Sequence, residues 1–167
     1  MRKSTILAAL SALLVTAYAP ARAEDGTIAF ELPRQKVSTY RKPYVAIWLQ
    51  DAEGKQVEVY DVFYDQAVQG KRWLPTLRTW WRRGGRAMAM PVSGVSRPTR
   101  GPGQYKVSMG SLASLKPGTY AVVVEAVREK GGREVVKLPF EWREGKTIAA
   151  SAEGSRELGR IAVSIGG

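Results

Sequence analysis

The chain has 167 residues, with 26 Lys or Arg against 15 Asp or Glu, and it contains neither histidine nor cysteine. Without histidine it lacks the usual residue of most zinc sites, of Ser-His-Asp catalysis and of His-ligated haem. Without cysteine it must fold on a packed core rather than on disulfides. Ser-Lys pairs and paired carboxylates are compatible with the composition, but no spacing indicates them. We therefore expect a protein that is not an enzyme, with no catalytic residues, no metal site and no resident cofactor.

The N-terminal segment has the pattern of a secretory signal peptide. Arg2 and Lys3 precede an apolar run over residues 6–15, and the small residues of Ala21-Arg22-Ala23 follow. The apolar run falls short of the ~20 residues that span a bilayer, which argues against an uncleaved anchor. We expect a signal peptide over residues 1–23 that is cleaved, and a periplasmic protein with a single domain over residues 24–167.

Apolar and polar residues alternate along most of the remaining chain, which is typical of strands. The segment 44–49 is apolar throughout and suits a central strand that is buried on both faces. Turn residues at 51–54 and at Gly131-Gly132 predict two hairpins. The seven expected strands cover residues 28–32, 44–49, 56–64, 104–109, 119–127, 136–142 and 161–165. Since long crossover helices are missing, this pattern predicts an all-β fold, an immunoglobulin-like antiparallel sandwich of about seven strands.

A tryptophan-rich segment interrupts the strand pattern. At the helical repeat its large apolar residues fall on one side and its arginines on the other, which predicts one short amphipathic helix. Pro75 suits its beginning, and Gly84-Gly85 suits its end. We expect this helix to close one end or edge of the sandwich, whereas exposed indoles would instead form a platform for nucleobases or flavin rings. The predicted buried face consists of Trp73, Leu74, Leu77, Trp80 and Trp81.

Positive charge is concentrated in residues 66–124, which contain ten Lys or Arg and no acidic residue. Without residues 1–23 the formal charge falls from +11 to +8, and the chain outside this stretch is nearly neutral. Such an asymmetry predicts a basic surface that attracts anionic partners, although the charge could also serve solubility alone. The candidate partner-binding or anion-binding residues are Lys71, Arg72, Arg78, Arg82, Arg83, Arg86, Arg97 and Arg100.

Residues 84–103 are rich in Gly, Pro and Arg, and we expect a long loop without regular structure. Met88 and Met90 alone make an incomplete copper site. Gly101 and Gly103 lack the longer glycine pattern of a phosphate-binding loop.

Four segments carry a resemblance to a known family: YVAIWLQDAEGK, KRWLPTLRTWWRR, SRPTRGPGQYKV and KPGTYAVVVEAVREKGGRE. Over residues 27–165 the chain resembles a family of small predicted periplasmic proteins whose domain has no established function. The resemblance implies an immunoglobulin-like fold. Because members tend to be encoded near PepSY and flavin-transfer proteins, it also implies an accessory role in envelope redox or iron-linked electron transfer. Members often carry histidine where this chain reads Arg128-Glu129-Lys130, so a role that depends on histidine does not transfer.

These observations predict a non-enzymatic periplasmic accessory or binding protein with a basic surface and a membrane redox partner, either PepSY-type or flavin-carrying. The alternative is direct binding of an anionic cofactor or lipid head group, such as FMN, haem or lipopolysaccharide phosphate. The secretory signal makes nucleic acid an unexpected partner.

Overall fold

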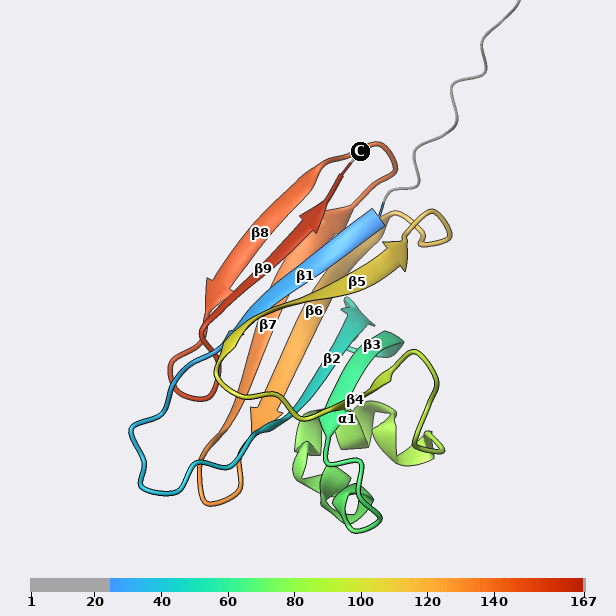
Figure 1. Ribbon diagram of the computed structural model, residues 1–167. Helices are drawn as coiled ribbons and strands as arrows, with labels where there is room; N and C mark the ends of the chain where they lie inside the picture. Colours follow the sequence, from blue (N-terminus) through green and yellow to red (C-terminus); the bar gives the residue numbers. More distant parts are fainter. Residues whose placement is uncertain (1–24, 167) are drawn as a thin grey trace, which may run out of the picture.

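The computed structural model describes residues 25–166, which form two stacked β-sheets and one short helical segment (Figure 1). The expected signal peptide over residues 1–23 lies outside the described residues. The four-stranded sheet has the order β5 (Gly103–Ser111), β1 (Asp25–Leu32), β9 (Arg160–Ile165) and β8 (Ile148–Glu153). The five-stranded sheet has the order β4 (Ser96–Pro98), β3 (Gln56–Tyr64), β2 (Tyr44–Asp51), β6 (Gly118–Val127) and β7 (Arg133–Trp142).

The main core lies between the two sheets and follows from the alternation of the strands. On β1 the buried residues include Ile28 and Phe30, and on β7 they include Leu138 and Phe140, while the residues between them are more exposed. The central strand β2 is buried on both faces, as its apolar sequence predicts. Its odd-numbered residues 45, 47 and 49 join this core, and its residues 46 and 48 face the outer side of the sheet.

The predicted all-β sandwich is confirmed, and each of the seven expected strands is present. The structure has nine strands rather than about seven, because β4 and β8 also pair. Pairing is antiparallel except between β3 and β4, which are parallel. The small alternating residues of β8, Ala150 and Ala152 among them, give a weak strand signal because alanine has a low β-propensity. The immunoglobulin-like connectivity stays a prediction.

The predicted short amphipathic helix is present, but it is divided. The segment consists of a 3-10 helix η1 (Gly70–Thr76), an α-helix α1 (Arg78–Arg83) and a 3-10 turn η2 (Gly85–Ala87). The backbone at Leu77 leaves the helical conformation, with φ −74° and ψ 69°, and Pro75 inside η1 has no N–H to donate. A 3-10 helix repeats every three residues, so Leu74 and Leu77 share a face that continues to Trp80. These three residues are buried.

The helical segment covers the outer face of the five-stranded sheet and does not close an end or edge of the sandwich, which corrects the expected position. Leu74, Leu77 and Trp80 pack on outward-facing residues of the sheet. In Figure 1 the segment lies beside β3 and β4. The sheet residues that it covers are Ala46, Trp48, Val62, Tyr64 and Val123. Burying such a large apolar face explains why the tryptophan-rich segment is needed.

The prediction that residues 84–103 lack regular structure is also wrong. They contain η2 and strand β4, whose three residues pair with the end of β3. The N–H of Val62 also donates to the carbonyl of Val95 at 2.8 Å. A three-residue strand that ends in proline has no alternation to reveal it in the sequence.

Candidate functional site

A buried carboxylate on β6 holds the helical segment in place. Glu125 is fully buried, and its side chain accepts hydrogen bonds from the backbone N–H groups of Thr79 at 3.1 Å and of Trp80 at 2.8 Å. Arg133 donates to the same carboxylate at 2.6 Å and to the Thr79 hydroxyl at 2.6 Å. Unpaired N–H groups at the beginning of a helix need such an acceptor, and a negative charge there is favourable. Glu125 therefore fixes α1 on the sheet.

The close approach of η2 to the helix depends on a glycine. A Cβ atom at Gly85 would lie 2.7 Å from the Trp80 ring, which is too close for any other residue without a shift. The indole of Trp80 is fully buried in the cluster on the outer side of the five-stranded sheet. We refer to this cluster, formed by Ala46, Trp48, Val62, Tyr64, Leu74, Leu77, Trp80 and Val123, as the outer cluster. The glycine pair after the helix thus positions the chain as well as ending α1.

Six of the predicted partner-binding residues lie on this fixed segment: Lys71, Arg72, Arg78, Arg82, Arg83 and Arg86. All six are exposed. The ion pairs found within residues 25–166 involve none of them. A shallow groove of about 330 Å³ is lined by Thr79, Arg82 and Arg83. We refer to these six residues as the helical cations.

The other two predicted residues differ from the helical cations. Arg97 on β4 donates to the Asp61 carboxylate at 3.0 Å, so its charge is already paired within the chain. Burial raises the pKa of Asp61, and the bond from Arg97 opposes this shift. Arg100 follows β4 and is exposed. The structure therefore assigns Arg97 to the attachment of β4 as well as to the surface.

Trp73 was expected on the buried face, and the structure places it on the surface. Its side chain is 56 % exposed, because it is out of phase with the three-residue repeat of Leu74, Leu77 and Trp80. The guanidinium of Arg72 lies 5.6 Å from the centre of its ring, within the range of a cation–π contact. Trp81 packs partly buried against the outer cluster.

Next to Trp73 lies a cleft with a volume of about 570 Å³. It is formed where five segments meet: the β1–β2 connection with the start of β2, the residue after β3, η1, the residue after β4 and the end of β6. Three aromatic side chains and three cations contribute to it, together with two carboxylates. Its lining residues are Tyr40, Arg41, Lys42, Tyr44, Asp65, Trp73, Thr76, Thr99, Val127, Arg128 and Glu129.

Two walls of the cleft are fixed by internal contacts. The Tyr44 hydroxyl donates to the carbonyl of Gly70 at 3.0 Å, which joins β2 to the first residue of η1. The guanidinium of Arg128 lies 6.0 Å from the centre of the Tyr40 ring. Burial raises the pKa of both tyrosines, so both remain protonated hydroxyls near neutral pH. Contacts within the chain thus hold Tyr40 and Tyr44 in the lining of the cleft.

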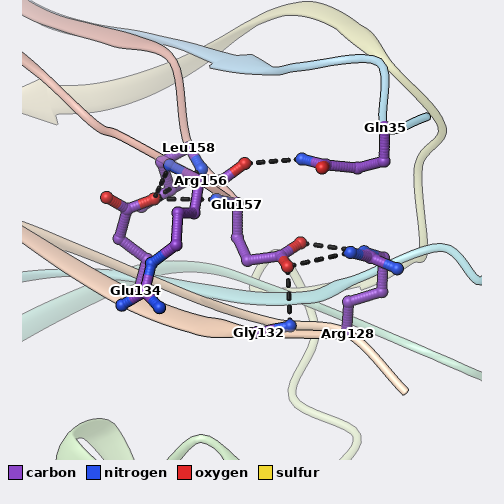
Figure 2. Close-up of polar contacts among 7 residues, drawn as sticks. All are labelled: Gln35, Arg128, Gly132, Glu134, Arg156, Glu157 and Leu158. Atoms are coloured by element: carbon purple, nitrogen blue, oxygen red, sulfur yellow. Dashed lines mark hydrogen bonds and ion pairs between the residues drawn. The ribbon is translucent and has the colours of Figure 1, made fainter. Parts of the chain in front are cut away.

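Arg128 is itself held by a buried ion pair with Glu157 (Figure 2). Its Nε and Nη2 atoms donate to the two carboxylate oxygens at 2.9 and 3.0 Å, and the N–H of Gly132 donates to the same carboxylate at 2.7 Å. A bidentate pair of this kind fixes the orientation of the guanidinium. Arg128 follows β6 in one sheet and Glu157 precedes β9 in the other, so the pair joins the two sheets beside the cleft.

Glu134 on β7 reinforces the same junction (Figure 2). Its carboxylate accepts from the backbone N–H groups of four consecutive residues, 155–158, at 2.6 to 3.0 Å, and from the Ser155 hydroxyl at 2.9 Å. Desolvation raises the pKa of Glu134, but these hydrogen bonds outweigh it and lower that pKa to about 2. The loop between β8 and β9 is therefore attached firmly to the β6–β7 hairpin.

The cleft was not expected from the sequence, although one signal for it is present. Residues 40–44 read YRKPY, in which two tyrosines flank a basic pair just before a buried strand. That spacing brings Tyr40, Arg41, Lys42 and Tyr44 to one site. The contributions of Trp73 and Arg128 come from distant segments, and no local pattern indicates them.

The chain has no match among the curated proteins or among the solved structures. No helix within residues 25–166 is long and apolar enough to cross a membrane. Residues 25–160 match a family described as "Predicted periplasmic protein (DUF2271)", in agreement with the expected location. This match covers most of the chain, which therefore belongs to the DUF2271 family of predicted periplasmic proteins.

Proposed function

We propose that the protein is a non-enzymatic periplasmic accessory protein that docks on an acidic surface of a membrane-associated redox protein. The observation that carries this proposal is that the helical cations are all exposed and that no ion pair within residues 25–166 engages them. Exposed cations that no carboxylate within residues 25–166 pairs are available to carboxylates of another protein. Arginine suits this role because its guanidinium can hold a carboxylate with two parallel hydrogen bonds.

The attachment of the segment supports docking rather than mere solubility. Glu125, Arg133 and the buried Trp80 hold α1 in one position on the sheet, so binding would order little of the backbone. The groove between Arg82, Arg83 and Thr79 is a suitable place for one carboxylate of the partner. Positive charge concentrated in one segment also accelerates association with an acidic partner and makes it sensitive to salt.

The redox nature of the partner rests on the resemblance to proteins encoded near PepSY and flavin-transfer proteins. A domain without histidine or cysteine lacks the usual ligands of haem, zinc and iron–sulfur groups. An accessory role, in which the partner carries the redox group, agrees with that composition.

The proposal is tested by cosedimentation of the protein with vesicles of the organism's own membranes. The test variant is Arg78→Glu/Arg82→Glu/Arg83→Glu, and the control is Lys137→Glu/Arg143→Glu/Lys146→Glu, which changes the net charge equally at exposed positions outside the segment. We expect the native protein and the control to bind at about 0.05 M salt and much less at about 0.5 M. The test variant should bind at least about tenfold more weakly. Equal binding of the two variants, or unchanged binding to vesicles stripped of exposed protein by protease, would contradict the proposal.

A further inference from the structure

We propose that the cleft beside Trp73 is a binding site for a small molecule that carries a planar ring and a single anionic group. The lining of the cleft includes none of the helical cations, although one of them, Arg72, lies against the Trp73 ring, and the inference does not use the docking proposed above. Its volume of about 570 Å³ lies within the range of ordinary small-molecule sites, roughly 300–1,000 Å³.

The aromatic residues indicate the ring. Within residues 25–166 most large aromatic side chains are buried in the two clusters, whereas Trp73 exposes 56 % of its surface at the edge of the cleft. Tyr40 and Tyr44 line the same space and are partly exposed. An exposed indole in a cleft with two phenol rings is suited to stacking on a flat ring.

The charged residues indicate one anionic group. Lys42 is exposed, and no ion pair within residues 25–166 involves it. Arg41 lies 3.8 Å from the Glu129 carboxylate and retains an exposed side chain. Asp65 and Glu129 also line the cleft, and these carboxylates would repel a ligand with several negative charges. A single phosphate or carboxylate near Lys42 is the charge pattern that the lining accommodates.

The rigidity of the cleft supports binding rather than a chance surface hollow. Arg128 is oriented by its bidentate pair with Glu157 and lies against Tyr40, and Tyr44 is fixed by its bond to Gly70. Side chains that are fixed before binding lose little entropy when a ligand arrives.

The test is isothermal titration of the purified protein with two matched pairs of probes. FMN and riboflavin share one ring system, and only FMN carries a phosphate. AMP and adenosine share a smaller ring system, and only AMP carries a phosphate. Inorganic phosphate serves as the probe without a ring. We expect at least one phosphorylated probe to bind at least about tenfold more tightly than its neutral counterpart and than phosphate. The pair that binds better identifies the kind of ring.

Substitutions then locate the site. Trp73→Ala should weaken binding by about 5- to 150-fold, the usual loss for one stacked ring, while Trp73→Phe should retain most of the affinity. Lys42→Gln should abolish most of the preference for the phosphorylated probe, and Lys106→Gln, which removes an exposed charge outside the cleft, should not. The inference is overturned if neither phosphorylated probe binds at millimolar concentration, if neutral probes or phosphate bind equally well, or if Trp73→Ala leaves the affinity unchanged. Loss of partner docking in the helical variants would not affect this result.

Discussion

The carboxylate of Glu125 accepts a hydrogen bond from the backbone N–H of Trp80 at 2.8 Å. Glu125 is the first acidic residue after the acid-free stretch of residues 66–124. It accepts hydrogen bonds from the helical segment that this stretch contains. The segment that concentrates the cations is therefore held on the sheet by the first carboxylate that follows it in the chain.

Replacing Glu125 by Ala should destabilise the protein considerably. The change leaves the N–H groups of Thr79 and Trp80 without their acceptor and Arg133 without its counter-charge. Because the Arg133 side chain is 33 % exposed and can be partly hydrated, we expect a loss of about 2–4 kcal/mol in the free energy of unfolding. Urea denaturation measures this loss. The control Glu144→Ala, at an exposed position, should change the free energy by less than about 0.5 kcal/mol, and an equal effect of the two changes would contradict the role of Glu125.

The two tryptophans of the helical segment should respond oppositely to truncation. Trp80 is fully buried and Trp73 is 56 % exposed. Trp80→Ala should cost about 3–5 kcal/mol of stability, whereas Trp73→Ala should cost less than about 1 kcal/mol. Thermal or urea unfolding of the two variants under identical conditions is the measurement. A larger loss of stability for Trp73→Ala than for Trp80→Ala would contradict the placement of Trp73 on the surface and of Trp80 in the core.

Glu134 should make stability depend on pH in the acid range. Desolvation raises its pKa, but hydrogen bonds from Leu158, Ser155 and Arg156 outweigh this and lower it from an ordinary 4.5 to about 2 in the folded protein. A carboxyl group whose pKa is lower in the folded than in the unfolded protein stabilises the fold at pH values above the unfolded pKa. This contribution is lost as the pH falls from 4.5 toward about 2. Glu134→Gln should therefore be less stable than the native protein near neutral pH, by roughly 1–2 kcal/mol because the carboxylate is partly exposed.

That difference in stability should shrink as the pH falls through this window. Denaturation curves of both proteins at a series of acid pH values provide the test. A constant difference between the native protein and Glu134→Gln across the window would show that titration of Glu134 does not make stability depend on pH.

The ion pair between Asp61 and Arg97 predicts an asymmetric double-mutant cycle. The Asp61 side chain is 8 % exposed and that of Arg97 is 49 % exposed. Arg97→Ala leaves a buried carboxylate without its partner and should cost roughly 1–3 kcal/mol, while Asp61→Asn leaves only a guanidinium that water can hydrate and should cost less. Asp61→Asn should therefore rescue much of the loss in the double variant. Additive effects in urea denaturation would show that the pair does not attach β4.

Much of the fold could be predicted from the sequence, because strands that bury one face alternate visibly. The strand expected over residues 136–142 is an example, because Leu138, Phe140 and Trp142 are buried at alternate positions. Strand β8 was not predicted, because its alanines give only a weak apolar alternation. Strand β4 was not predicted, because three residues are too few to show an alternating pattern. The helical segment was assigned the wrong repeat, since Pro75 and the break at Leu77 replace 3.6 residues per turn by three. The cleft joins five separate segments, and only the folded chain brings them together.

The central claim is that the helical cations are the docking surface. The most direct measurement is photo-crosslinking in living cells from a benzoylphenylalanine placed at Arg82, with the same probe at Lys137 as control, followed by mass spectrometry of the adducts. The account predicts an adduct from Arg82, and not from Lys137, with a membrane protein that carries a flavin or haem and has an acidic periplasmic surface. No adduct from Arg82, or the same adducts from both positions, would contradict it.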